Sequence, residues 1–202
     1  MKKTMLLLVF ALGFIGLNAQ ENSKKVSMGI KAEANTAFFL LNDLDNAGSK
    51  VKLGGNVGVF TKIMLNEHLA IQPELMLTLR NSELKLAGVK NDYQYFGAEI
   101  PVYCVGQWNW GRGKFMIGAG PYVGVGFNAK FKNGNIDLFD NNTNVEMNRW
   151  DIGAGLTMGY EFRNGLQINL GHKFGLLNVL NNGQGDESIH NQVLSVGLGF
   201  RF

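Results

Sequence analysis

Cysteine, proline and long apolar runs are all scarce in this chain of 202 residues. The only cysteine, Cys104, excludes an internal disulfide. Because it lies within an apolar strand pattern, we expect a small buried or lipid-facing side chain rather than a nucleophile. Beyond residue 19, no apolar run approaches the roughly 20 residues that a membrane-spanning helix needs. Any membrane-embedded structure must therefore be built from strands.

An excess of charge is also lacking. Subtracting Lys2 and Lys3 from the 19 basic residues leaves 17, against 16 acidic residues, so the rest of the chain has a net charge of +1. The basic residues form no clustered face of the kind that binds nucleic acid. We therefore expect no nucleic-acid partner.

Residues 1–19 have the features of an export signal. Lys2 and Lys3 precede an apolar stretch that runs from Met5 to Leu17, and Ala19 offers a small residue at the expected cleavage site. This stretch is too short for an anchoring helix. We expect a signal peptide over residues 1–19 and one domain over residues 20–202 that is exported across the inner membrane.

In the rest of the chain, apolar residues alternate with small or polar ones. This two-residue period is typical of a strand with one apolar face. The ending is especially clear, because Leu194, Val196, Leu198, Phe200 and Phe202 occupy every second position. Eight strands are predicted, over residues 25–40, 51–65, 69–82, 93–110, 114–131, 149–163, 166–178 and 190–202.

The connections alternate between short and long. Short turns are predicted at 66–68, 111–113 and 164–165, where Asn164-Gly165 is a strong hairpin signal. Longer polar loops are predicted at 41–50, 83–92, 132–148 and 179–189. Bacterial outer-membrane barrels have short periplasmic turns and longer outer loops. The pattern predicts an all-β fold: an eight-stranded antiparallel up-and-down transmembrane β-barrel in the outer membrane of a Gram-negative bacterium, with both termini periplasmic.

Alternation alone also fits a soluble lipocalin-like barrel, whose apolar face lines a ligand cavity. A membrane barrel is favoured because the weaker face is rich in glycine, small polar residues and charges, as a narrow wet lumen requires. Aromatic residues also gather near the predicted strand ends, as at bilayer interfaces. These are Phe38, Tyr93, Trp108, Trp110, Phe131, Trp150, Tyr160, Phe162, Phe174, Phe200 and Phe202.

Four parts of the sequence form a recognisable set. They are Tyr95-Phe96-Gly97-Ala98-Glu99-Ile100-Pro101-Val102, Gly120-Pro121-Tyr122-Val123-Gly124, the pattern over residues 151–178, and the ending Gly197-Leu198-Gly199-Phe200-Arg201-Phe202. Together they resemble the outer-membrane β-barrel family that includes PorT-like proteins. The resemblance spans nearly the whole exported chain and implies an eight-stranded porin-like small barrel in the outer membrane. The resemblance implies no single activity. PorT-like members are linked to protein secretion, but these motifs do not predict that role for this chain.

If the apolar face meets lipid, twelve charged residues are predicted to face the lumen. They are Lys31, Glu33, Lys62, Glu74, Arg80, Glu99, Lys130, Asp151, Glu161, Arg163, Lys173 and Arg201. Buried charges must be paired or hydrated, so we expect a structural network that plugs the lumen. The alternative is a small gated pore, with Glu74, Arg80 and Glu99 as candidate gates.

The sequence gives little support to the hypothesis of an enzyme, because an outer-membrane hydrolase typically needs a histidine beside a carboxylate or serine. His68 lies in a predicted turn and His172 on the lipid-facing side of its strand. His190 lies near the polar run Asp186-Glu187-Ser188, where a solvated loop is the expected structure. No metal-ligand spacing, phosphate loop or dinucleotide fingerprint is present, so no cofactor is expected.

The leading hypothesis is a barrel with a structural, anchoring or loop-mediated binding role. A narrow porin-like channel for small polar solutes and a soluble binder are the alternatives. The expected partners are outer-membrane lipid and the barrel-assembly machinery, which would recognise the last strand ending in Phe202. An unidentified protein or ligand could bind at the long loops.

Overall fold

A computed structural model describes residues 25–41, 48–86, 89–131, 136–137, 149–176 and 189–202 of the chain. The predicted signal peptide over residues 1–19 lies outside these ranges. Within them, no helix is both long enough and apolar enough to cross a membrane.

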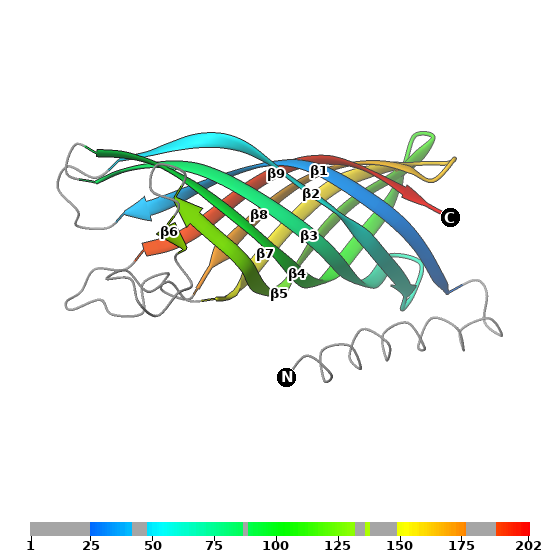
Figure 1. The fold of residues 1–202 in the computed structure, drawn as a ribbon. Helices are drawn as coiled ribbons and strands as arrows, with labels where there is room; N and C mark the ends of the chain where they lie inside the picture. Colours follow the sequence, from blue (N-terminus) through cyan, green and yellow to red (C-terminus); the bar gives the residue numbers. More distant parts are fainter. Residues whose placement is uncertain (1–24, 42–47, 87–88, 132–135, 138–148, 177–188) are drawn as a thin grey trace.

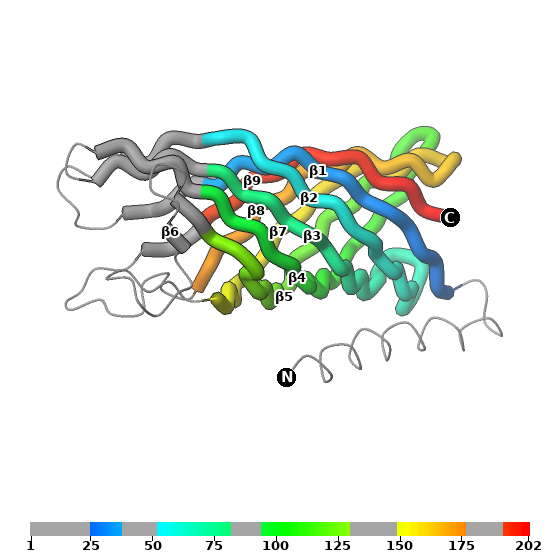
Figure 2. The backbone as a smooth tube through the Cα atoms, in the orientation of Figure 1, coloured from blue at the N-terminus to red at the C-terminus, as the bar shows by residue number. Residues whose placement is uncertain are grey.

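Eight long strands form a closed antiparallel barrel in which each pairs with the next long strand along the chain, and the two-residue strand β6 adds only to the end of β5 (Figure 1). The strands are β1 (Val26–Leu41), β2 (Gly48–Met64), β3 (Leu69–Leu86), β4 (Val89–Trp110), β5 (Gly113–Phe131), β6 (Ile136–Asp137), β7 (Trp150–Phe162), β8 (Leu166–Gly175) and β9 (Ile189–Arg201). Pairing of β1 with β9 closes the ring, from Gly29 opposite Arg201 to Leu41 opposite Ile189. Figure 2 shows these first and last strands side by side and inclined to the barrel axis. The predicted eight-stranded meander is confirmed.

Tight turns form at one end of the barrel, where the sequence predicts them. Gly111 and Gly165 have φ angles of 59° and 87°, a region that glycine enters without steric penalty. The Asn66 side-chain oxygen accepts hydrogen bonds from the backbone N–H groups of His68 and Leu69, both at 2.9 Å. Hydrogen bonds from nearby backbone N–H groups to an asparagine side chain stabilise a turn. The carboxyl end of β9 and the start of β1 lie at this same end (Figure 1), here called the short-turn end.

The prediction of a long loop at 83–92 is wrong. β3 and β4 stay paired through most of this range, with Glu83 opposite Asp92 and Leu86 opposite Val89. A further short strand, β6, lies inside the predicted loop at 132–148 and pairs with the end of β5. The polar sequence suggested loops, but backbone hydrogen bonds hold these ladders together and do not require apolar alternation.

The outer face of the barrel is apolar and the lumen is polar. Leu77, Val196 and Leu198 are exposed on the outside, whereas Glu74, Thr78 and other polar residues are buried inside. A lipocalin-like binder would have the reverse arrangement. The soluble alternative is therefore wrong.

A β-bulge in the β4–β5 pair shifts the inner face of β5. Phe96 pairs with Asn128 but Gly97 pairs with Gly126, so Phe127 is an extra residue. Asn128, which strict alternation from the buried Gly126 would place in the lumen, is consequently exposed, and Ala129 is buried instead. The side chain of Lys130, predicted to face inward on the same alternation, lies outside the described residues.

Candidate functional site

The lumen is the most distinctive site of the barrel, because ten of the twelve predicted charges meet there. Five are positive and five negative, and each forms an ion pair with at least one other. They divide into three clusters. The ten residues are Lys31, Glu33, Lys62, Glu74, Arg80, Glu99, Asp151, Glu161, Lys173 and Arg201.

The first cluster spans the lumen from β3 to β8. The buried carboxylate of Glu99 accepts a hydrogen bond from Arg80 and another from Lys173 Nζ at 2.5 Å. Arg80 also donates to Asp151 Oδ2 at 2.9 Å, and the Tyr122 hydroxyl donates to the other Asp151 oxygen at 3.0 Å. Two cations and two carboxylates thus form a neutral bridge across four strands.

The second cluster lies on β1, β2 and β3. Lys31 Nζ is 2.6 Å from Glu74 and 3.8 Å from Glu33. Amide side chains complete it, because Gln72 donates to Glu74 at 2.8 Å and Asn56 donates to Glu33 at 2.8 Å. Amide donors thus supplement the single cation of this cluster, which faces two carboxylates.

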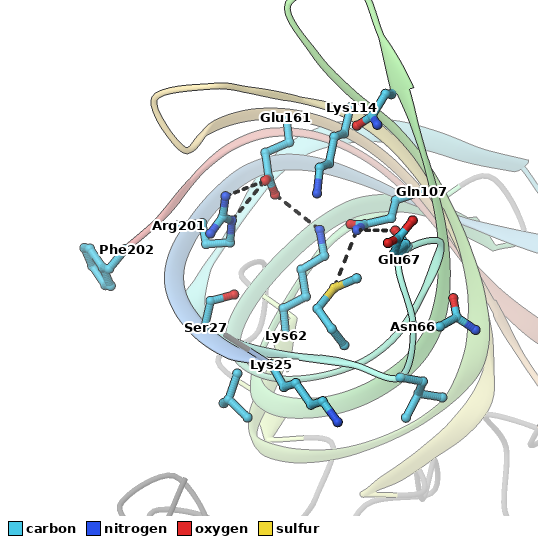
Figure 3. A pocket seen from close by; sticks show the side chains of 14 residues that line it. Lys25, Ser27, Lys62, Asn66, Glu67, Gln107, Lys114, Glu161, Arg201 and Phe202 are labelled. Carbon is cyan, nitrogen blue, oxygen red and sulfur yellow. Dashed lines mark hydrogen bonds and ion pairs between the residues drawn. The ribbon is translucent and has the colours of Figure 1, made fainter. Parts of the chain in front are cut away.

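The third cluster lies near the short-turn end and is centred on Glu161 (Figure 3). Arg201 binds one carboxylate oxygen through Nε at 2.9 Å and Nη2 at 2.8 Å. Lys62 Nζ contacts the other oxygen at 3.2 Å, and Gln167 donates to it at 2.8 Å. This cluster has two cations for one carboxylate, so it carries an excess of positive charge.

Bulky side chains, which were not predicted to fill the lumen, occupy the space between the clusters. Tyr103, Val105 and Met116 form a buried group in the lumen. Phe60 and Tyr122 are also buried there, each at 1% exposure. Their inward parity is visible in the sequence, but alternation does not reveal which inward side chains reach across the lumen.

Glycines on the wall make room for these rings. A Cβ added at Gly29 would lie 2.3 Å from Phe60 Cζ. One at Gly153 would lie 1.9 Å from the backbone oxygen of Phe174 on the neighbouring strand and 2.6 Å from Tyr122 Cε1. All three distances are far below van der Waals contact. The two glycines are therefore required by close packing against lumen rings and, at Gly153, against the next strand, rather than by a turn.

The expectation that Arg163 faces the lumen is wrong. β7 ends at Phe162, and Arg163 lies in the exposed turn before β8. Alternation places Glu161 in the lumen, but extending the same alternation by two residues to Arg163 passes the end of β7. Strand ends are set by the turn at Gly165 and not by the apolar period.

The histidines and Cys104 do not form a reactive centre among the described residues. His172 contacts Phe174 on the outer side, with ring centroids 3.9 Å apart, and His68 is exposed in its turn. Cys104 is exposed on the outer face. The side chain of His190 and residues 186–188 lie outside the described part. In the rest, no group of three or more histidine, cysteine or acidic residues is arranged to hold a metal.

Family comparison agrees with this architecture. Residues 18–181 match the family model of the outer membrane protein beta-barrel domain. The chain belongs to this family. Membership implies the outer membrane of a Gram-negative bacterium, as the sequence predicted. The family match does not separate PorT-like members from the other members. The resemblance to PorT-like proteins therefore stays a prediction. No curated protein sequence matches the chain.

Two solved structures illustrate the shared fold. Outer membrane protein OprG from Pseudomonas aeruginosa is 10% identical, with a TM-score of 0.55 over 88% of this chain and 96% of that one. Neisserial surface protein A is 15% identical, with a TM-score of 0.50 over 88% of this chain and 99% of the other. At these identities the likeness concerns the fold alone.

Proposed function

We propose that this outer-membrane barrel is a non-enzymatic structural scaffold with a sealed lumen. The observation that carries the proposal is the bridge of Arg80, Glu99, Asp151 and Lys173 across the lumen. It joins strands β3, β4, β7 and β8, which lie on different sides of the ring. An eight-stranded barrel leaves a lumen just wide enough for side chains.

Conduction through this lumen would be energetically unfavourable. A permeating ion would have to separate buried, hydrogen-bonded ion pairs, and removing one partner from such a pair costs about 3–5 kcal/mol. It would also have to displace the buried Tyr103 and Met116 side chains. Paired charges and bulky side chains thus oppose passage in succession along the barrel axis.

Single-channel recording tests the sealed lumen directly. Detergent-purified protein inserted into a planar bilayer should give no current steps under applied voltage. Insertion must be verified in the same preparation by heat-dependent gel mobility, which reports a compact folded barrel. Regular steps that change in the Arg80→Ala variant would refute the proposal and support the narrow-pore alternative.

Unequal strand lengths support a role as a scaffold, because they make part of the barrel wall longer than the rest. β3 and β4 have 18 and 22 residues, whereas β8 has 10. Crossing the bilayer takes about 9–11 residues per strand. The paired ends of β3 and β4 therefore extend beyond the apolar band, at the end of the barrel opposite the short turns (Figure 1). We propose that this extension presents a binding surface outside the cell, with both chain termini periplasmic.

Epitope insertion tests this orientation. An epitope inserted between Leu86 and Val89 should be detected by antibody on intact cells. The matched insertion between Trp110 and Gly113, in a short turn, should be detected only after the outer membrane is permeabilised. The reverse pattern would overturn the proposed orientation.

A further inference from the structure

The barrel is hollow at its short-turn end. A cavity of about 640 Å³ opens there (Figure 3), with Lys62, Lys114 and Arg201 among the residues that line it. Lys62 Nζ lies 3.2 Å from Met116 Sδ, and Met116 packs with Tyr103 and Val105 below the cavity. The cavity, here called the vestibule, is therefore open at one end and floored by the side chains that fill the lumen.

Positive charge is in excess in the vestibule. Its lining includes four cationic residues, Lys25, Lys62, Lys114 and Arg201, against two acidic ones, Glu67 and Glu161. Glu161 is already bound by both Arg201 and Lys62. Lys114 has neither an ion pair nor a hydrogen bond to any of the described residues, and its ammonium group points into the cavity (Figure 3).

The vestibule also holds a buried hydrogen-bond acceptor that has no donor. Gln107 is 1% exposed, and its side-chain NH₂ donates to the Glu67 carbonyl at 3.2 Å and to Met64 Sδ at 3.5 Å. Its Oε1 atom has no partner within the described structure. A buried carbonyl oxygen left without a donor is unfavourable, so a ligand that brings one would be stabilised.

We propose that the vestibule binds a small anion that also carries a hydrogen-bond donor, of the hydrogen phosphate or hydroxycarboxylate class. Lys114, which has no partner among the described residues, would contact the anionic oxygens through charge-assisted hydrogen bonds. Lys62 would use the N–H donor that its contacts with Glu161 and Met116 leave over. The hydroxyl of the ligand would donate to Gln107 Oε1. Since the vestibule opens away from the sealed lumen, this binding requires no transport through the barrel.

Comparing phosphate with sulfate tests the donor requirement. The two are tetrahedral anions of similar size, but only phosphate carries a protonated oxygen near neutral pH. Calorimetric titration of the detergent-purified full-length protein with inorganic phosphate should show saturable binding, and sulfate should bind roughly tenfold more weakly. Equal affinities would overturn the role of Gln107, and no phosphate binding at millimolar concentration would overturn the proposal.

Charge-matched variants test the site itself. Lys114→Gln should weaken phosphate binding by roughly tenfold or more, since it removes a charge-assisted hydrogen bond. Arg163→Gln removes the same charge at the same end of the barrel but outside the vestibule, and should bind phosphate like the parent protein. Gln107→Met should abolish the preference for phosphate over sulfate. Equal loss in Lys114→Gln and Arg163→Gln would show a diffuse charge effect and overturn the site.

Folding of each variant is verified by heat-dependent gel mobility before titration. If Gln107→Met does not fold, the phosphate and sulfate titrations of the parent protein still decide the donor requirement. If Lys114→Gln does not fold, Lys114→Met replaces it with a side chain of similar length. A folded Lys114 variant that binds phosphate like the parent protein would contradict the proposal.

Discussion

Replacing Glu99 with glutamine tests the lumen bridge, because it removes the charge shared by Arg80 and Lys173 while nearly preserving shape. The Glu99 side chain is 1% exposed and that of Lys173 is 8% exposed. Arg80 would keep Asp151 at 2.9 Å, but Lys173 would lose the carboxylate that it contacts at 2.5 Å. Breaking a buried pair costs 3–5 kcal/mol, and Arg80 keeps a partner, so we expect E99Q to lower the unfolding free energy by about 3 kcal/mol.

The assay is equilibrium urea unfolding in lipid vesicles, followed by the fluorescence of Trp108, Trp110 and Trp150, which are exposed on the outer face. The double variant E99Q/K173M should be less destabilised than the sum of E99Q and K173M, because it leaves no unpaired lysine. R163Q, in an exposed turn, should stay within about 0.5 kcal/mol of the parent protein. An E99Q variant as stable as R163Q would refute the bridge.

Two further predictions concern the wall of the barrel. Gly29→Ala should destabilise the fold by about 1–3 kcal/mol, because its Cβ would clash with Phe60. Gly55→Ala, where the nearest atom is 3.5 Å away, should cost clearly less in the same urea titration; equal costs would contradict the packing argument. The native Cys104 thiol faces outward on β4, so a water-soluble maleimide should label it only after unfolding. Rapid labelling of the folded protein in vesicles would show that this face is not covered by lipid.

The barrel could be predicted from sequence because its determinants are local. Apolar alternation fixes which side chains of a strand face lipid, and Asn164-Gly165 marks a hairpin without knowledge of the partner strand. Glu74, Arg80 and Glu99 were placed in the lumen by parity alone. The features that were missed depend on more than one strand.

Three differences show where local pattern is insufficient. The bulge at Phe127 arises from pairing between β4 and β5, so strict alternation misplaces Asn128. The extended ladder of β3 and β4 runs beyond the bilayer, where polar residues are tolerated on both faces. The vestibule needs Lys114 and Gln107 from neighbouring strands to converge at one end of the barrel. Their inward parity was readable, but the cavity they line was not.

In this barrel the apolar side chains face lipid and the charged side chains face the lumen, where the vestibule is open to water. Spin labels at Leu77 and Leu198, in a Cys104→Ser background, should collide frequently with oxygen, which concentrates in the bilayer. A label at Arg201, whose side chain is 31% exposed at the vestibule, should instead collide with a water-soluble nickel chelate. A label at Leu77 or Leu198 reached by the nickel chelate, with Arg201 reached mainly by oxygen, would contradict the account.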